Sequence, residues 1–340
     1  MPDRQGEEEN FMKEKAKKRL FVFALCACVA LGSIGASIAD YSAETVSADT
    51  TADGAFTTDG TGNGSEISPY LIDTAQELYY ISTKANSFKD KYIKMTADID
   101  LSEYGTSFNG GDGWPGIAYF GRHFDGDGHS IKNLYTTKTG LFASLTQGTE
   151  PSVSNLVTEN ATVVSESNNT GIIVGQLKNG KVENCTVKNT CSVTGAQAVG
   201  GIVGTLDGGS ISGCTNYANV VSASANGCVG GIVGTVVSKA DNRTITVQKC
   251  VNRGKVSAAV KNVGGIVGQF NAQKATCTFT LRECVNYGAV NGGSSTGGVI
   301  GISQSANTYN ATVKDCYNVG LVTGAPAAGN FIGGFVGNGK

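Results

Sequence analysis

The five residues Gly200-Gly201-Ile202-Val203-Gly204 decide the fold, because they recur along the chain. The phrase is repeated or slightly altered at 171–175, 230–234, 264–268, 297–301 and 333–337. Its closing glycines are separated by 29, 30, 34, 33 and 36 residues. Self-similarity at a period of about 20–50 residues is typical of stacked repeat proteins. The repeat therefore predicts a solenoid, which grows along one axis and holds most of the 340 residues in one domain.

A second element follows each phrase, an apolar residue three positions before a cysteine, as in Val247 and Cys250. The last four of these cysteines are followed two residues later by an asparagine, at Asn216, Asn252, Asn286 and Asn318. β-Branched residues suit strands, and Gly and Asn accept the backbone conformations of sharp corners. Three short strands per turn, stacked about 4.8 Å apart, make a parallel β-helix. The fold class is therefore all-β.

The offset of three between the apolar residue and the cysteine breaks strict alternation, so a kink or bulge must separate them if both point inward. Five of the eight cysteines after residue 39 share this repeat position: Cys185, Cys214, Cys250, Cys284 and Cys316. They fit a mainly reduced ladder of small apolar core residues. Stacked Cα atoms about 4.8 Å apart also allow disulfides, which leaves that alternative open.

The chain before the repeats divides into a leader and a linker. Residues 1–39 hold a basic start, an apolar run from Leu20 to Ala36 and small residues up to Ala39, which predicts a secretion signal with Met12 as the true start. An uncleaved membrane anchor is the alternative, because the apolar run is near the length that spans a bilayer. Residues 40–64 are rich in Ser, Thr, Ala, Asp and Gly and predict a flexible linker.

We expect the β-helix to occupy residues 65–340, with a short helix at 74–87 that covers its first coil. Thr74-Ala75-Gln76-Glu77 forms a capping box at the start of that helix, and Leu78 and Ile81 fall on one face. At the other end, Phe335-Val336-Gly337 opens a new unit, and the chain stops at Lys340. Because a solenoid end normally carries a polar cap, we expect this end to be uncapped or truncated.

The opening of the repeat region contains five further motifs: Pro69-Tyr70-Leu71-Ile72, Asp98-Ile99-Asp100-Leu101, Trp114-Pro115-Gly116-Ile117, His123 to Leu134 and Gly140-Leu141-Phe142. With the repeated phrases they resemble bacterial exported proteins that bear GLUG-motif repeats, over about residues 64–340. The resemblance implies a right-handed parallel β-helix of the pectate-lyase-like kind. Members are adhesin-like or other surface proteins, or non-catalytic regions of larger exported enzymes, including some IgA-cleaving metallopeptidases. The metallopeptidase signature His-Glu-x-x-His is absent here, so the enzyme activity does not carry over.

Residues with catalytic or metal-binding chemistry are sparse. Asp125-Gly126-Asp127-Gly128-His129 resembles the start of a calcium loop, but the later ligands are missing, and Asp-Gly turns explain it. The acids of the repeats are scattered, at Glu183, Asp207, Asp241, Glu283 and Asp315. Three of them recur one or two residues before the cysteine, so a stacked acid pair is the alternative to solvated repeat positions. Glycan-cleaving enzymes need clustered carboxylates. We therefore expect no catalytic residues, no metal and no cofactor.

With a net charge of −2, the chain offers no positively charged surface for nucleic acid. We expect contact with a membrane only through the signal segment, if that segment stays uncleaved.

One difference between the coils points to a binding surface. From closing glycine to cysteine there are ten residues in the first two units, but sixteen, sixteen and fifteen in the next three. Insertions in a repeat protein map to one face, often the binding face, although tolerated surface loops are the alternative. The segments 235–246, 269–280 and 302–312 are named the ledge. Its candidate binding residues are Lys239, Asp241, Asn242, Arg243, Gln273, Lys274, Gln304, Asn307 and Tyr309.

These features favour a non-catalytic, secreted or cell-surface protein, adhesin-like or used for display, whose partner is a protein or glycan on host or neighbouring cells. The first alternative is a non-catalytic segment of a larger exported enzyme. The second is a polysaccharide-degrading β-helix.

We predict export with cleavage near Ala39, because a basic start precedes the apolar run. Mass spectrometry of the secreted protein should find an N-terminus close to residue 40. A secreted product that still begins before residue 20 would contradict this prediction.

Overall fold

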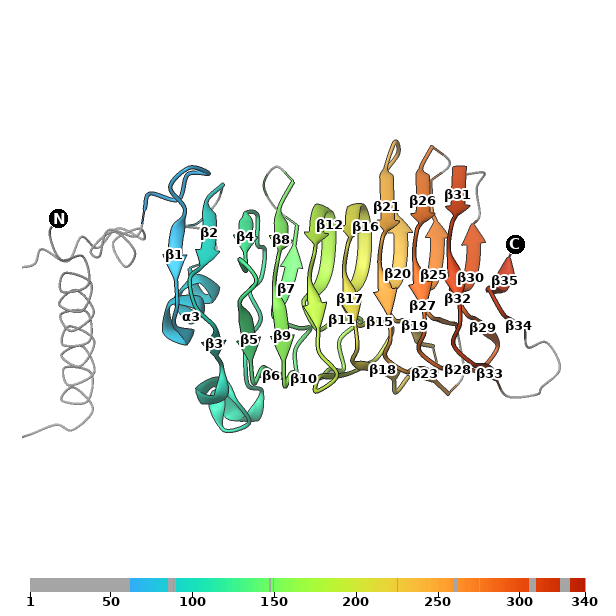
Figure 1. The fold of residues 1–340 in the computed structure, drawn as a ribbon, viewed down its shortest axis with the longest axis horizontal. Coiled ribbons are helices and arrows are strands. Elements are labelled where there is room, and N and C mark those ends of the chain that lie inside the picture. The colour runs from blue at the N-terminus through green and yellow to red at the C-terminus, as the bar shows by residue number, and fades with distance from the viewer. Residues whose placement is uncertain are drawn as a thin grey trace, which may run out of the picture. The chain divides into compact units, whose positions relative to one another are not determined.

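The computed structural model describes residues 62–339, except 85–87, 89, 147, 149, 225, 260, 261, 275, 306–309 and 325–330. The predicted signal segment and nearly all of the linker lie outside these residues. Within the described part nearly every element is a strand, and all pairings between the named strands are parallel (Figure 1). The parallel β-solenoid that the repeats predict is therefore confirmed.

From β7 (Phe142–Leu145) onward, each coil runs out along one strand and returns along another, and we call these the first and second arm. Both belong to sheet 1, which has fourteen strands. The first arms are β7 (Phe142–Leu145), the start of β12 (Val174–Glu183), the start of β16 (Val203–Ser212), β20 (Val233–Ser238), β25 (Val267–Ala272), β30 (Ile300–Ser305) and β35 (Val336–Gly339). The second arms are β1 (Tyr70–Ile72), β2 (Tyr92–Met95), β4 (His123–Asp125), β8 (Ser152–Ser154), the ends of β12 and β16, β21 (Thr244–Gln248), β26 (Thr278–Arg282) and β31 (Asn310–Lys314).

Three further sheets complete the coil. Sheet 2 is β3 (Ile99–Asp100), β5 (Ser130–Lys132), β9 (Val157–Glu159), β13 (Thr186–Val187), β17 (Thr215–Asn216), β22 (Val251–Asn252), β27 (Val285–Asn286) and β32 (Tyr317–Asn318). Sheet 3 is β6 (Tyr135–Thr136), β10 (Thr162–Val164), β14 (Ser192–Gly195), β18 (Asn219–Ser222), β23 (Val256–Ala258), β28 (Val290–Gly292) and β33 (Val322–Gly324). Sheet 4 is β11 (Asn169–Gly171), β15 (Ala198–Gly200), β19 (Cys228–Gly230), β24 (Val263–Gly264), β29 (Ser295–Gly297) and β34 (Phe331–Gly333).

The prediction of three strands per turn is wrong, because a full coil contributes two arms and a strand in each of sheets 2, 3 and 4. Several of these strands, such as β22, are two residues long. A two-residue strand is shorter than the alternation by which a strand is recognised in a sequence.

The kink expected before each cysteine is a single residue in the left-handed backbone region. Its φ lies between 52° and 63° in six successive coils, at Asn155, Asn184, Gly213, Lys249, Glu283 and Asp315. This residue turns the second arm into sheet 2, so that Val247 and Cys250 are both fully buried despite their offset of three. The left-handed region is unfavourable for residues with a Cβ, and stacking against neighbouring coils must hold Lys249 and Glu283 there.

The asparagines of the repeat form a buried hydrogen-bonded ladder. Asn216 Nδ2 donates to Asn252 Oδ1 at 2.9 Å, and Asn252 Nδ2 donates to Asn286 Oδ1 at 2.8 Å. Asn286 Nδ2 continues the ladder to Asn318 Oδ1 at 2.8 Å. Each Nδ2 also donates to the carbonyl two residues ahead in its own coil, for example Asn252 to Gly254 at 2.9 Å. These buried amides are thus paired along the solenoid axis and within each coil.

The second glycine of four repeated phrases lies against this ladder, at Gly201, Gly231, Gly265 and Gly298. A Cβ on Gly231 would overlap the side-chain amide of Asn252 and the carbonyl oxygen of Gly265. The same overlap exists between Gly265 and Asn286. The glycine-rich phrase and the asparagine therefore recur together in the sequence because they contact each other in the structure.

The N-terminal helix is α3 (Ala75–Thr83), which lies beside β1 at the start of the solenoid (Figure 1). The predicted capping box is present, since Glu77 N donates to Thr74 Oγ1 at 3.3 Å and Thr74 N donates to Glu77 Oε2 at 3.0 Å. Leu78 and Ile81 are fully buried, as their spacing predicts. Lys84 is the C-cap, and 85–87 lie outside the described residues. Two 3₁₀ turns follow at Ser102–Tyr104 and Phe108–Gly111.

No helix in the described residues has the length and apolar character needed to cross a membrane.

We predict that Gly231→Ala destabilises the protein strongly, because its methyl group has no room against Asn252. Asn252→Ala should cost about 2–4 kcal/mol, since it removes the partners of two buried amides. Gly334→Ala is the matched control, because a Cβ at this equivalent position meets nothing within 4 Å. Denaturant unfolding that finds Gly231→Ala and Gly334→Ala equally stable would refute the Gly–Asn contact.

Candidate functional site

The ledge is built from lengthened arms. β20, β25 and β30 pair in register through Ser238, Ala272 and Ser305. β21, β26 and β31 pair in register over all five residues. The added residues therefore extend the two arms as paired strands, with only short tips between them. The lengthened arms rise above the shorter coils of β12 and β16 at the top of Figure 1.

The apolar core of the solenoid continues into the base of the ledge. Phe270 of the first arm stacks on Phe279 of the second arm with 4.4 Å between ring centroids and 16° between planes. Both rings are buried, and so are Val236 and Ile245 of the preceding coil, which stand in register with them. Stacked rings and aliphatic neighbours hold the two arms together. Val237, Ala272 and Cys277, which are buried within the lengthened segments, extend this packing along the arms.

The tips of neighbouring coils are hydrogen-bonded to each other. Thr276 Oγ1 donates to Asp241 Oδ1 at 3.1 Å and accepts from the backbone N–H of Asn242 at 3.0 Å. The N–H of Lys239 donates to Asp207 Oδ1 at 3.2 Å, which joins the ledge to the shorter coil before it. These contacts order the backbone of the tips and leave long side chains outside.

The structure brings the candidate binding residues of the first two ledge coils to the tips and places Gln304 of the third coil on β30. The side chains of Lys239, Asp241, Asn242, Gln273, Lys274 and Gln304 are exposed. Arg243 is half-buried beside Gly208, and its Nε has no hydrogen-bond partner among the described residues. Asn307 and Tyr309 lie outside the described residues.

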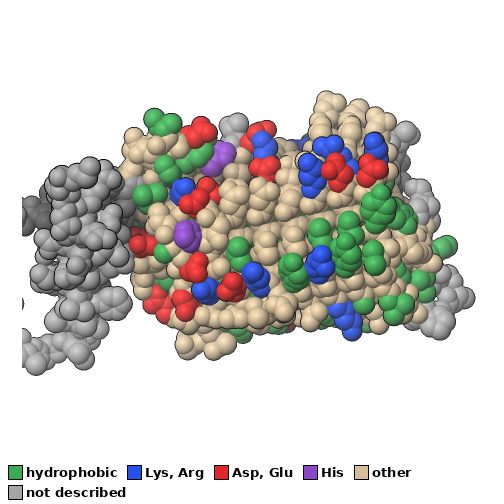
Figure 2. Space-filling view, viewed as in Figure 1, with side chains coloured by type: hydrophobic (Ala, Val, Ile, Leu, Met, Phe, Trp, Pro, Cys, Tyr) green, Lys and Arg blue, Asp and Glu red, His purple; other side chains and the backbone are tan. Residues whose placement is uncertain are grey.

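Charged side chains gather at the base of the ledge, as Figure 2 shows along the upper part of this face. Arg282 Nε donates to Gln248 Oε1 at 2.8 Å, and its Nη1 lies 3.6 Å from Glu283 Oε1. Glu283 Oε2 is also 3.9 Å from Lys249 Nζ, and Asp315 Oδ2 is 3.7 Å from Lys314 Nζ. These are exposed pairs of low strength. The ledge can therefore offer hydrogen bonds and charges of both signs to a partner.

The acids of the repeats are spread over the coil. Glu183 lies in the row of Ser212 and Gln248, whereas Glu283 and Asp315 occupy the kink position one residue later. Asp207 and Asp241 lie at arm tips. No group of three or more His, Cys, Asp or Glu side chains suited to a metal ion occurs in the part of the chain that the structure describes.

The segment 125–129 forms the predicted turn. Asp127 and Gly128 have φ of 49° and 83°, and His129 N donates to Gly126 O at 2.8 Å. Asp127 Oδ2 is 3.0 Å from Lys94 Nζ, and His129 Nδ1 is 3.6 Å from Asp98 Oδ1. The side chains of the turn thus point to neighbouring coils and not to a common centre.

The repeat cysteines form the interior ladder that their spacing predicts. All eight cysteines in the described residues carry free thiols, and Cys185, Cys214, Cys250 and Cys284 are fully buried. Each donates to the carbonyl two residues before it, as Cys250 Sγ does to Gln248 O at 3.1 Å. Burial, together with the adjoining thiols of Cys185 and Cys250, raises the pKa of Cys214. A thiol that stays protonated is a poor nucleophile.

A surface that the sequence analysis missed lies on sheet 2, directly after the asparagine ladder. Tyr217, Arg253 and Tyr287 come from three successive coils, and the Arg253 guanidinium lies 4.4 Å from the Tyr287 ring centroid and 5.9 Å from that of Tyr217. Tyr217 is 39% exposed and Tyr287 is 45% exposed. Figure 2 shows hydrophobic side chains around a cation in the right half of this face. The residue after each repeat asparagine is the sequence position that identifies this row.

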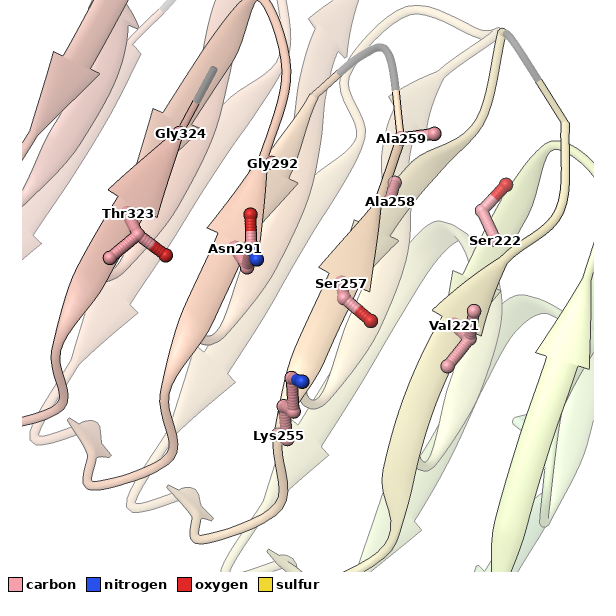
Figure 3. A pocket seen from close by; sticks show the side chains of 10 residues that line it. All are labelled: Val221, Ser222, Lys255, Ser257, Ala258, Ala259, Asn291, Gly292, Thr323 and Gly324. Atoms are coloured by element: carbon pink, nitrogen blue, oxygen red, sulfur yellow. The ribbon is translucent and has the colours of Figure 1, made fainter. Parts of the chain in front are cut away.

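A groove of about 610 Å³ adjoins this row on the outer face of sheet 3. Its floor is a row of side chains from β18, β23, β28 and β33, namely Val221, Ser257, Asn291 and Thr323 (Figure 3). Lys255, two residues after Arg253, lines one end of the groove. The groove therefore combines hydroxyl, amide and ammonium groups beside two exposed phenol rings.

Comparison with known proteins places the fold and gives no named family. No family model matches the chain. A solved structure of a candidate immunoglobulin A1 protease from Bacteroides ovatus has a TM-score of 0.63 and 25% sequence identity, over 82% of this chain and 86% of that one. Halomucin from Haloquadratum walsbyi is 36% identical over 156 residues, which is 41% of this chain and 2% of halomucin. The chain thus spans a very small part of that long protein.

We predict that Cys250→Ser costs about 1–3 kcal/mol unless the hydroxyl keeps the hydrogen bond that the thiol donates to Gln248 O, because a hydroxyl without a partner then lies among apolar neighbours. In native protein, thiol labelling should reach the half-buried Cys316 first and Cys214, Cys250 and Cys284 only on unfolding. Rapid labelling of Cys250 in the native protein would show that the ladder is exposed.

Proposed function

We propose that the protein is an exported, non-catalytic β-solenoid of the GLUG-motif kind that acts as an adhesin-like binding or display module. The observation that carries this proposal is the ledge. Three consecutive coils lengthen in register, and side chains of the lengthened segments, such as Ala272, Cys277 and Phe279, are buried. A packed projection with ordered tips offers a partner a pre-formed surface, which lowers the entropic cost of binding.

Export is supported by the predicted leader and by the similarity to halomucin, whose name denotes a mucin. The absence of catalysis is an expectation that rests on the sequence. Among the acids of the repeats only Glu283 and Asp315 stack on each other, at the kink position beside cations, and the repeat thiols from Cys185 to Cys284 are buried. Neither set resembles the clustered groups of a hydrolase.

The partner would be a protein or glycan on a host or neighbouring cell, bound across the ledge. Lys239, Lys274 and the amides of Asn242 and Gln304 are exposed there and can hydrogen-bond to an extended ligand. Few aromatic side chains lie among the described tip residues, so we expect modest affinity from a single module.

The Bacteroides ovatus structure favours one alternative, a non-catalytic segment of a larger exported enzyme. The genomic sequence around the region that encodes this chain discriminates between the two, because a protease or lyase domain there would select the alternative. A polysaccharide-degrading β-helix is the second alternative, and it predicts sugar release by the purified protein.

The test shortens each ledge coil to the ten-residue spacing of the coil before it. The register aligns Asp207-Gly208-Gly209 with 237–245, 271–279 and 304–311, so each of these three segments is replaced by Asp-Gly-Gly. We expect adhesion to host cells or matrix to fall at least tenfold while the solenoid stays folded.

A second variant keeps the length of the arms and changes only exposed tip residues, with Lys239, Asn242, Lys274 and Gln304 replaced by Ala. It should lose adhesion as well, because the partner contacts these side chains. Full adhesion by both folded variants would overturn the proposed role of the ledge.

A further inference from the structure

Charge is divided unevenly along the solenoid. Residues 65–183 hold 9 Lys and Arg against 14 Asp and Glu, whereas residues 184–340 hold 11 against 4. The net charge of the two parts is therefore −5 and +7. All four acids of the second part lie on the arms or at the kink position, and two of them, Glu283 and Asp315, are next to cations.

Sheets 2 and 3 of the second part consequently carry cations without acids. Lys188, Arg253 and Lys255 lie on or beside these sheets, and no Asp or Glu occurs between 184 and 206, 213 and 240, 249 and 282 or 284 and 314. The face that holds the Tyr217–Arg253–Tyr287 row and the groove thus attracts anions.

We propose that this face binds a glycan chain that carries carboxylates. Arg253 and Lys255 would pair with the carboxylates, because a guanidinium held between two rings presents its remaining edge to solvent. The uncharged row of Ser257, Asn291 and Thr323 would take sugar hydroxyl and amide groups along the groove. Sparse cations separated by neutral polar groups suit a glycan in which charged and uncharged sugars alternate.

An extended peptide fits this face less well. Peptides that bind a sheet by strand addition use unpaired main-chain groups at an edge. The strands β23 and β28 are paired on both sides, so recognition here rests on side chains. Exposed phenol rings beside hydroxyl and amide groups offer hydrogen bonds and apolar contact to the mixed surface of a sugar.

This site is separate from the ledge. In Figure 1 the ledge rises at the top of the coils, whereas β18, β23, β28 and β33 lie at the bottom. The inference therefore does not depend on the proposed function. The ledge-shortened variant should still bind the glycan, which distinguishes failure of one proposal from failure of the other.

The probe is hyaluronan, in which a carboxylate-bearing sugar alternates with an uncharged N-acetylated sugar. We expect the protein to bind it more tightly than neutral dextran, with an affinity that falls as salt is raised. Arg253→Ala together with Lys255→Ala should weaken binding at least tenfold. Lys178→Ala is the matched control, because it removes an exposed cation from β12, outside sheets 2 and 3, and should change binding less than twofold.

Tyr287→Ala separates glycan recognition from plain charge attraction, since it removes a ring and no charge. It should weaken hyaluronan binding at least fivefold in a protein whose thermal unfolding is unchanged. Equal affinity for dextran, tighter binding of poly-glutamate or heparin, or equal losses in the Lys178→Ala control would each overturn the proposal. Concentration-dependent self-association that the same double variant abolishes would assign the face to a second copy instead.

Discussion

The contact between a glycine and a stacked asparagine is the constraint on which every later coil depends. Because the side-chain amide of Asn252 lies against Gly231, position 231 has no room for a side chain. The amide in turn donates to the next coil and to its own backbone, so its position fixes both the spacing of the coils and the corner after sheet 2. Buried amides that are all paired specify one arrangement, because any slip of a coil would leave several of them unsatisfied.

The fold could be predicted from the sequence because the repeat consists of residue types that each favour few local conformations. Glycine at closely packed positions, β-branched residues in strands and Thr74 with Glu77 at a helix start each indicate one local conformation. The contacts across coils could not be read in the same way. Asn252 and Asn286 are 34 residues apart, and only the register shows that their amides touch. The number of sheets was also missed, since Val251–Asn252 resembles a corner more than a strand.

The candidate site was predictable only where it changed the length of the repeat. Extra residues mark the ledge in the sequence, but the packing of Phe270 on Phe279 follows from the return of the chain along the second arm. The row of Tyr217, Arg253 and Tyr287 leaves no such mark. Its members are chemically different, and only their shared place after the asparagine ladder reveals them as neighbours.

The arm tips differ from the rest of the coil in one respect, because they lie outside the ladder of glycine and asparagine. Between Val236 and Val247 the two arms can grow or shrink together without moving any amide of the interior. The tips are therefore natural points for grafting. A foreign segment such as an epitope could replace residues 239–243, because the packing of the coils beneath does not depend on the sequence of the tip. New binding specificity could arise there by insertion alone, because the rest of each coil keeps its length.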